Sequence, residues 1–186
     1  MSGSAKRHGE THEYVPAPDP GDWRARKGLM VRRGGALVAL NAVVVGAVEL
    51  GEDASIWFGC VLRGDDAPIR VGPRTNIQDL SVVHADPQIP NEIGADCVIG
   101  HRVVLHGSRV GDLCLIGMGA ILLGGSKIGS GSIIGAGTLV KEGTEVPPRS
   151  LVVGVPGRVI RGVPDEALEA IRRNVAGYVQ KAKLYL

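Results

Sequence analysis

Aliphatic residues recur along the middle of the chain at a spacing of six. The series is strictest in the C-terminal half, where it comprises Val110, Ile116, Leu122, Ile128, Ile134, Val140 and Val146. Shorter series with the same spacing precede it: Val44, Leu50, Ile56 and Leu62, then Val71, Ile77 and Val83, then Ile93, Ile99 and Leu105. A repeat this regular predicts a solenoid in which each six-residue unit supplies one short strand and one turn.

Two other positions of the unit are also restricted in composition. Glycine often follows the aliphatic residue, as at Gly72 and Gly100. We expect it to turn the backbone at a corner, because glycine reaches conformations that other residues avoid. Four residues after the aliphatic residue lies a small or modest side chain, and Cys60, Cys97 and Cys114 occupy this position. We therefore interpret the cysteines as packing residues and not as catalytic ones.

The predicted architecture is a parallel β-helix of hexapeptide repeats, in which three units form one triangular coil and each coil pairs with the next. Residues 23–163 carry this pattern. From Asp165 the apolar residues follow steps of three and four, which predicts an amphipathic helix over residues 164–186, packed on the β-helix or at a subunit contact. Residues 1–22 are rich in Gly, Pro and charge, and we expect them to be loosely ordered.

Composition narrows the class of protein. A length of 186 residues suits one domain, and an aromatic content of 3% with 28 glycines requires a core of small and branched aliphatic side chains. The net charge of +2, without a long basic run, argues against nucleic acid or an anionic membrane surface as partner. No segment resembles a signal peptide or a membrane span, so we expect a cytoplasmic protein that binds a small molecule or another protein.

Two histidines share one position of the repeat. His84 follows Val83 directly, and His106 follows Leu105 three units later. Because three units make one coil, both histidines are expected in the same column of one face, about 4.8 Å apart at the backbone. Arg63 is expected in this column one coil lower. A lone histidine in a polar column is usually a surface hydrogen-bonding residue, but two stacked histidines favour a metal site.

A third histidine is expected on a different face. His101 lies two places after Ile99, with Asp79 beneath it on the preceding coil. A single prism cannot easily gather all three imidazoles, whereas a neighbouring subunit around a three-fold axis can present His101 to the other two. We therefore infer a homotrimer with interfacial metal sites. Three histidines leave the fourth tetrahedral position open, as in catalytic zinc sites.

The motifs in residues 54–163 resemble those of the γ-class carbonic anhydrases and their homologues. They are RGDDAPI at 63–69, NIQD at 76–79, VVH at 82–84, IGHRVVLHG at 99–107, IGMGA at 116–120 and PPRSLVVGVPGRV at 147–159. The resemblance implies a left-handed β-helix and a homotrimer. It also implies a Zn²⁺ ion, or Fe²⁺ or Co²⁺ in some members, bound by His84 and His106 of one subunit and His101 of another.

The resemblance further implies the reaction and the residues around the metal. The reaction is the reversible hydration of CO₂ to bicarbonate by a metal-bound hydroxide. Arg63 and Asp65 would belong to an inter-subunit ion-pair network with Asp79 as a further partner, and Asn76 and Gln78 would orient the hydroxide and CO₂. Structural roles are the alternative: Asp65 can end a turn, Arg63 can tie subunits together, and Gln78 can cap backbone groups.

One departure from the family pattern leaves other functions open. The acidic loop that follows the first histidine in the family's archetype is short here, and residues 85–92 offer only Asp86 and Glu92. Asp66 is a candidate replacement for the missing proton shuttle. The alternatives are a hexapeptide-repeat acyl-CoA transferase or thioesterase with a histidine general base, and a non-catalytic metal-binding or siderophore-binding homologue.

Overall fold

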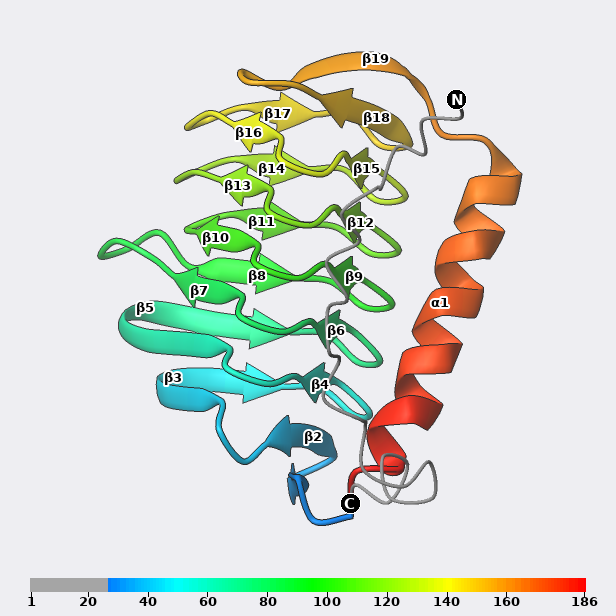
Figure 1. The fold of residues 1–186 in the computed structure, drawn as a ribbon. Helices are drawn as coiled ribbons and strands as arrows, with labels where there is room; N and C mark the ends of the chain where they lie inside the picture. Colours follow the sequence, from blue (N-terminus) through cyan, green and yellow to red (C-terminus); the bar gives the residue numbers. More distant parts are fainter. Residues whose placement is uncertain (1–26) are drawn as a thin grey trace, which may run out of the picture.

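The computed structural model describes residues 27–186 and shows a parallel β-helix with one α-helix alongside it (Figure 1). The fold class that the six-residue repeat predicted, with its C-terminal helix, is therefore confirmed. The segment 1–22, expected to be loosely ordered, lies outside the described residues. No helix within residues 27–186 is both long and apolar enough to cross a membrane.

The strands form three faces. The first face, which lies beside the helix, contains β1 (Met30–Arg33), β2 (Ala36–Ala39), β4 (Ser55–Ile56), β6 (Asn76–Ile77), β9 (Val98–Ile99), β12 (Leu115–Ile116), β15 (Ile133–Ile134), β18 (Ser150–Val153) and β19 (Arg158–Gly162). The second contains β7 (Val82–His84), β10 (Val104–His106), β13 (Ile121–Leu122) and β16 (Leu139–Val140). The third contains β8 (Asn91–Ile93), β11 (Arg109–Val110), β14 (Lys127–Ile128) and β17 (Glu145–Val146). The longer strands β3 (Val43–Leu50) and β5 (Val61–Val71) pass from the second face to the third.

Each short strand points one residue outward and the next inward, so the repeated aliphatic residues fill the interior of the prism. Val83, Leu105 and Leu122 are fully buried and lie in register on successive coils. The three cysteines are buried and have free thiols. Burial raises the pKa of the Cys60 thiol to about 11, which keeps it protonated and unreactive at neutral pH.

The reason for the glycine after each aliphatic residue differs from the prediction. The backbone turns two residues after the position that glycine often occupies. There Leu80, Arg102 and Gly119 have positive φ angles of 62°, 58° and 69°. Glycine is instead required because neighbouring coils touch: a Cβ atom on Gly72 would lie 2.5 Å from the carbonyl carbon of Gly94. The restriction therefore comes from space between coils and not from backbone conformation.

The three faces differ in what they present outward. The apolar outward residues of β9, β12, β15 and β18 pack against α1 (Asp165–Lys183), whose buried side is Leu168, Ile171, Val175, Val179 and Ala182. The second face carries a column of apolar residues: Val43, Val61, Val82, Val104, Ile121 and Leu139. The third face carries a column of charged residues: Glu49, Arg70, Glu92, Arg109, Lys127 and Glu145. The first face is thus covered by α1, and the charged third face can be exposed to solvent. The second face is apolar, and none of the described residues covers it.

Candidate metal centre

His84 and His106 lie at the ends of adjacent strands on the apolar second face. β7 and β10 pair in parallel with His84 directly opposite His106, so the predicted shared column is confirmed. Their ring centroids are 5.4 Å apart and the ring planes are inclined by 62°. The two side chains are 13% and 33% exposed. Two imidazoles at this separation can approach one ion from the same side.

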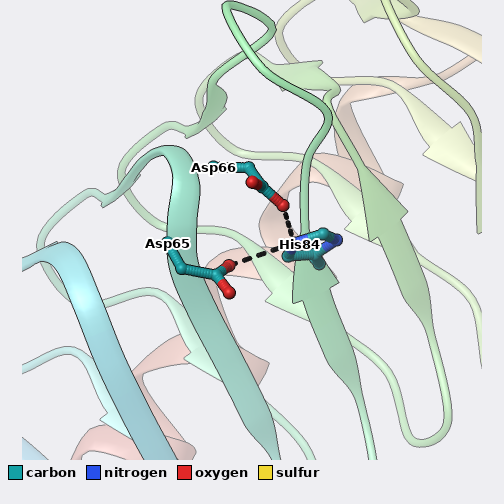
Figure 2. Close-up of side chains that lie close together, drawn as sticks. All are labelled: Asp65, Asp66 and His84. Atoms are coloured by element: carbon teal, nitrogen blue, oxygen red, sulfur yellow. Dashed lines mark hydrogen bonds and ion pairs between the residues drawn. The ribbon is translucent and has the colours of Figure 1, made fainter.

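Carboxylates from the long strand β5 converge on the first histidine. Figure 2 shows Asp65 and Asp66 pointing toward His84, and one oxygen of each lies 3.2 Å from His84 Nε2. Arg63 donates a hydrogen bond to Asp65, and this contact lowers the pKa of the Asp65 carboxyl below its usual value. The two exposed carboxylates give Nε2 of His84 a negatively charged environment.

Close packing of β3 and β5 fixes where this acidic segment leaves the prism. Gly46 faces Gly64, and a Cβ atom on Gly46 would lie 2.4 Å from the Gly64 carbonyl group. Strand β5 pairs with β7 only at its first two residues, so Arg63 and the residues that follow it project from the regular coil. The break in the six-residue pattern there corresponds to this projection.

Asp65 and Asp66 are acidic residues that the sequence did not assign as ligands. Within residues 27–186, ligand atoms of Asp65, Asp66 and His84 lie within 4.8 Å of one another, a spacing that a metal ion could bridge. The two consecutive acidic residues after Arg63 were a visible signal, but the hexapeptide count cannot place residues in an insertion. His106 has a more distant acidic neighbour, with Asp86 Oδ2 at 3.8 Å from its Nδ1.

His101 lies at the edge of the first face and points to a different neighbour. Its Nδ1 lies 2.8 Å from Asp79 Oδ2, and the other Asp79 oxygen accepts a hydrogen bond of 3.2 Å from the Phe58 amide. Within the single chain Asp79 thus contacts His101, and its part in an inter-subunit network with Arg63 stays a prediction. A carboxylate bound to Nδ1 fixes the ring and leaves Nε2 as the ligand atom. In the single chain, His101 does not join the other two histidines.

The amide pair predicted to orient substrate is buried close to His101. Gln78 Nε2 donates to Asn76 Oδ1 at 3.0 Å, and Asn76 Nδ2 donates to the Cys97 carbonyl at 3.3 Å. Asn76 is fully buried and Gln78 is 5% exposed. This chain of hydrogen bonds holds Gln78 in one orientation, and Gln78 and His101 line a hollow of about 210 Å³. The predicted role toward CO₂ remains a prediction.

A second hollow of about 350 Å³ also borders His101. Its lining comprises Trp57, Phe58, Asp79, His101, Tyr178, Lys181 and Tyr185. The Trp57 ring centroid lies 5.3 Å from that of Tyr178 and 5.5 Å from that of Tyr185. Burial, followed by the charge of Asp79, raises the pKa of the Tyr178 phenol. Aromatic side chains from the turn after β4, from α1 and from the residues after α1 therefore meet beside the Asp79–His101 pair.

Comparisons with known proteins agree with this arrangement. Residues 107–142 match the family model described as Bacterial transferase hexapeptide (six repeats). The "Probable carbonic anhydrase" of Methanocaldococcus jannaschii is 50% identical over 77% of this chain and 90% of its own. The "Carbonic anhydrase" of Geobacillus kaustophilus is 43% identical over 81% of this chain and 82% of its own.

A solved structure shares the fold. A hexapeptide transferase family protein from Anaplasma phagocytophilum is 36% identical, with a TM-score of 0.79 over 83% of this chain and 91% of that one. The identity and coverage of the carbonic anhydrase relatives, together with the histidine positions in the coils, identify the family. This chain belongs to the γ-class carbonic anhydrase-like family of hexapeptide-repeat proteins.

Proposed function

We propose that the protein catalyses the reversible hydration of CO₂ to bicarbonate at metal centres formed between the subunits of a homotrimer. The observation that carries this proposal is the register of His84 and His106 on adjacent coils, with ring centroids 5.4 Å apart, while His101 lies on a different face. The third ligand then has to come from another subunit. Relatives named carbonic anhydrase support the reaction class.

The residues present fit a divalent ion such as Zn²⁺, or Fe²⁺ or Co²⁺. Three neutral imidazoles are suitable ligands for each of them. The Asp79 carboxylate on His101 Nδ1 is the second contact that metal-binding histidines usually make. When bound, such an ion would lower the pKa of water from its bulk value to near 7, which supplies hydroxide for attack on CO₂ near neutral pH.

The outward columns support the trimer. The second face, which carries His84 and His106, leaves Val43, Val82 and Ile121 between 38% and 51% exposed. The edge that carries His101 leaves Leu80 and Met118 60% and 62% exposed. Contiguous exposed apolar residues on a soluble protein mark an interaction surface. Packing the second face of one subunit on the His101 edge of the next covers both and unites the three ligands.

The chain's own residues have distinct tasks in this proposal. Arg63 neutralises Asp65 and keeps its carboxylate ionised beside His84. Asp66, with an oxygen 3.2 Å from His84 Nε2, is placed to accept a hydrogen bond or a proton at the open side of the site. Gln78, held by Asn76, offers its remaining amide atoms toward the hollow beside His101.

The test is a His106→Ala variant measured by metal analysis and stopped-flow CO₂ hydration, on protein purified without air. We expect loss of both bound metal and hydration, with the β-helix intact by circular dichroism. A Lys127→Ala variant on the charged third face is the control and is expected to keep both. Undiminished hydration by His106→Ala would refute the proposal.

Acyl transfer from coenzyme A is the second candidate function. The family model is described as a transferase, and a structural relative is a hexapeptide transferase family protein. Such an enzyme needs one histidine as a general base and gains nothing from three convergent ones. Thermal-shift titration separates the two: stabilisation by coenzyme A that survives zinc chelation favours acyl transfer, and destabilisation by the chelator alone favours the metal centre.

A further inference from the structure

The larger hollow beside His101 contains a lysine that forms no ion pair within residues 27–186. Lys181 lies in the last turn of α1, and its ammonium nitrogen is 4.9 Å from the Tyr178 ring centroid. Within residues 27–186, no carboxylate lies within 4.0 Å of this nitrogen, whereas Lys183 on the same turn pairs with Asp53 at 3.2 Å. Lys181 therefore forms no ion pair with the described residues, although the carboxylate of Asp79 also lines the hollow.

The acidic residue that lines the hollow is hydrogen-bonded to other groups. Asp79 is its acidic lining residue, but one Asp79 oxygen faces His101 Nδ1 and the other accepts the Phe58 amide. Trp57 and Phe58 supply apolar walls, beside which electrostatic attraction is stronger than in bulk water. Tyr178, whose pKa is raised by burial, remains protonated at neutral pH and is able to donate a hydrogen bond.

We propose that this hollow is a binding site for a small monovalent oxyanion, held by the Lys181 ammonium between the aromatic walls beside His101. The ligand is bicarbonate, the anion of the reaction proposed above, and this part of the inference rests on that function. A site of about 350 Å³ is at the small end of ligand pockets. Lys181 would hold bicarbonate near the metal centre as the anion arrives or leaves. Lys181 is therefore a specificity-determining residue in this proposal.

The test is anion binding followed by the fluorescence of Trp57, which lies in the wall of the hollow. All proteins carry Trp23→Phe, so that Trp57 is the single tryptophan. The probes are bicarbonate and acetate at constant pH and ionic strength, in metal-loaded and metal-free protein. Acetate is a monovalent carboxylate that cannot be turned over, so its binding does not depend on catalysis.

We expect saturable binding of both anions, weakened at least tenfold in Lys181→Gln and largely restored in Lys181→Arg. Lys183→Gln is the matched control, since it removes a charge two residues away that is already paired, and it should bind as the parent protein does. In the dehydration assay, Lys181→Gln should raise KM for bicarbonate at least fivefold and change kcat less than twofold.

The outcomes separate this inference from the proposed function. Unchanged binding in Lys181→Gln, an equal loss in Lys183→Gln, or binding that is confined to metal-loaded protein would overturn the anion site, even if CO₂ hydration is normal. Lys181-dependent binding of acetate in a protein without CO₂ hydration would support the anion site while the proposed enzymatic function fails.

Discussion

Replacement of Asp79 tests how the third histidine is held. Asp79 Oδ2 lies 2.8 Å from His101 Nδ1, within hydrogen-bond distance. We expect Asp79→Ala to weaken metal binding because the imidazole loses the partner that fixes its orientation and leaves Nε2 as the ligand atom. Asp79→Asn should weaken it less, since the amide oxygen can still accept the Nδ1 hydrogen.

The size of the effect follows from the geometry. Loss of a carboxylate that orients a metal-binding histidine typically costs 10- to 100-fold in affinity, or about 1.4 to 2.7 kcal/mol. The His101 and Asp79 side chains are 37% and 34% exposed in the single chain. Water screens contacts that are this exposed, so we expect a loss near the lower end, about tenfold per site.

Zinc affinity is measured by competition with a chromophoric chelator, with thermal unfolding and sedimentation to check fold and assembly. Asp86→Ala is the matched control, because Asp86 Oδ2 lies 3.8 Å from His106 Nδ1, beyond hydrogen-bond distance. Its affinity should change less than threefold. Equal losses in the two variants, or none in Asp79→Ala, would refute the role assigned to Asp79.

Three further predictions concern the core, the interface and the ion pair. Leu105→Ala should lower the free energy of unfolding by about 2–5 kcal/mol in denaturant titrations, because Leu105 is fully buried between coils. Ile121→Asp should dissociate the proposed trimer in sedimentation experiments while Lys127→Ala leaves it intact; a trimer that survives Ile121→Asp would contradict the proposed interface. Arg63→Gln should raise the Asp65 pKa toward its ordinary value in a carboxyl NMR titration. Because the folded-state pKa of Asp65 is depressed, the stability advantage over this variant is present above about pH 3.9 and is lost as pH falls through the folded-state pKa.

The regular part of the molecule could be predicted from sequence because its geometry is set by one period. Counting in sixes placed His84 opposite His106, and placed His101 above Asp79 on a different face. The count sets aside the insertion in residues 85–92, and the positions that remain belong to regular units. Steric packing between coils enforces such units, so position in the repeat determines position in space.

The irregular part could not be predicted in the same way. Arg63 to Asp66 lie where β5 leaves the coil, and only the structure shows both carboxylates turning back to His84. The aromatic cluster beside His101 joins Trp57 to Tyr178, residues separated by most of the chain and by a change from strand to helix. Contacts of this kind depend on how the helix returns along the prism, which a six-residue period does not encode.

The stacking of coils also bears on how such a chain can change in length. Each coil touches only the coil before it and the coil after it. Duplication of a whole coil beyond Val140 would lengthen the prism and leave the His84–His106 spacing unchanged. The same duplication between residues 84 and 106 would double that spacing to about 9.6 Å and separate the pair. For the histidine pair alone, a coil added at the distal end of the solenoid is therefore neutral, and a coil added between residues 84 and 106 is disruptive.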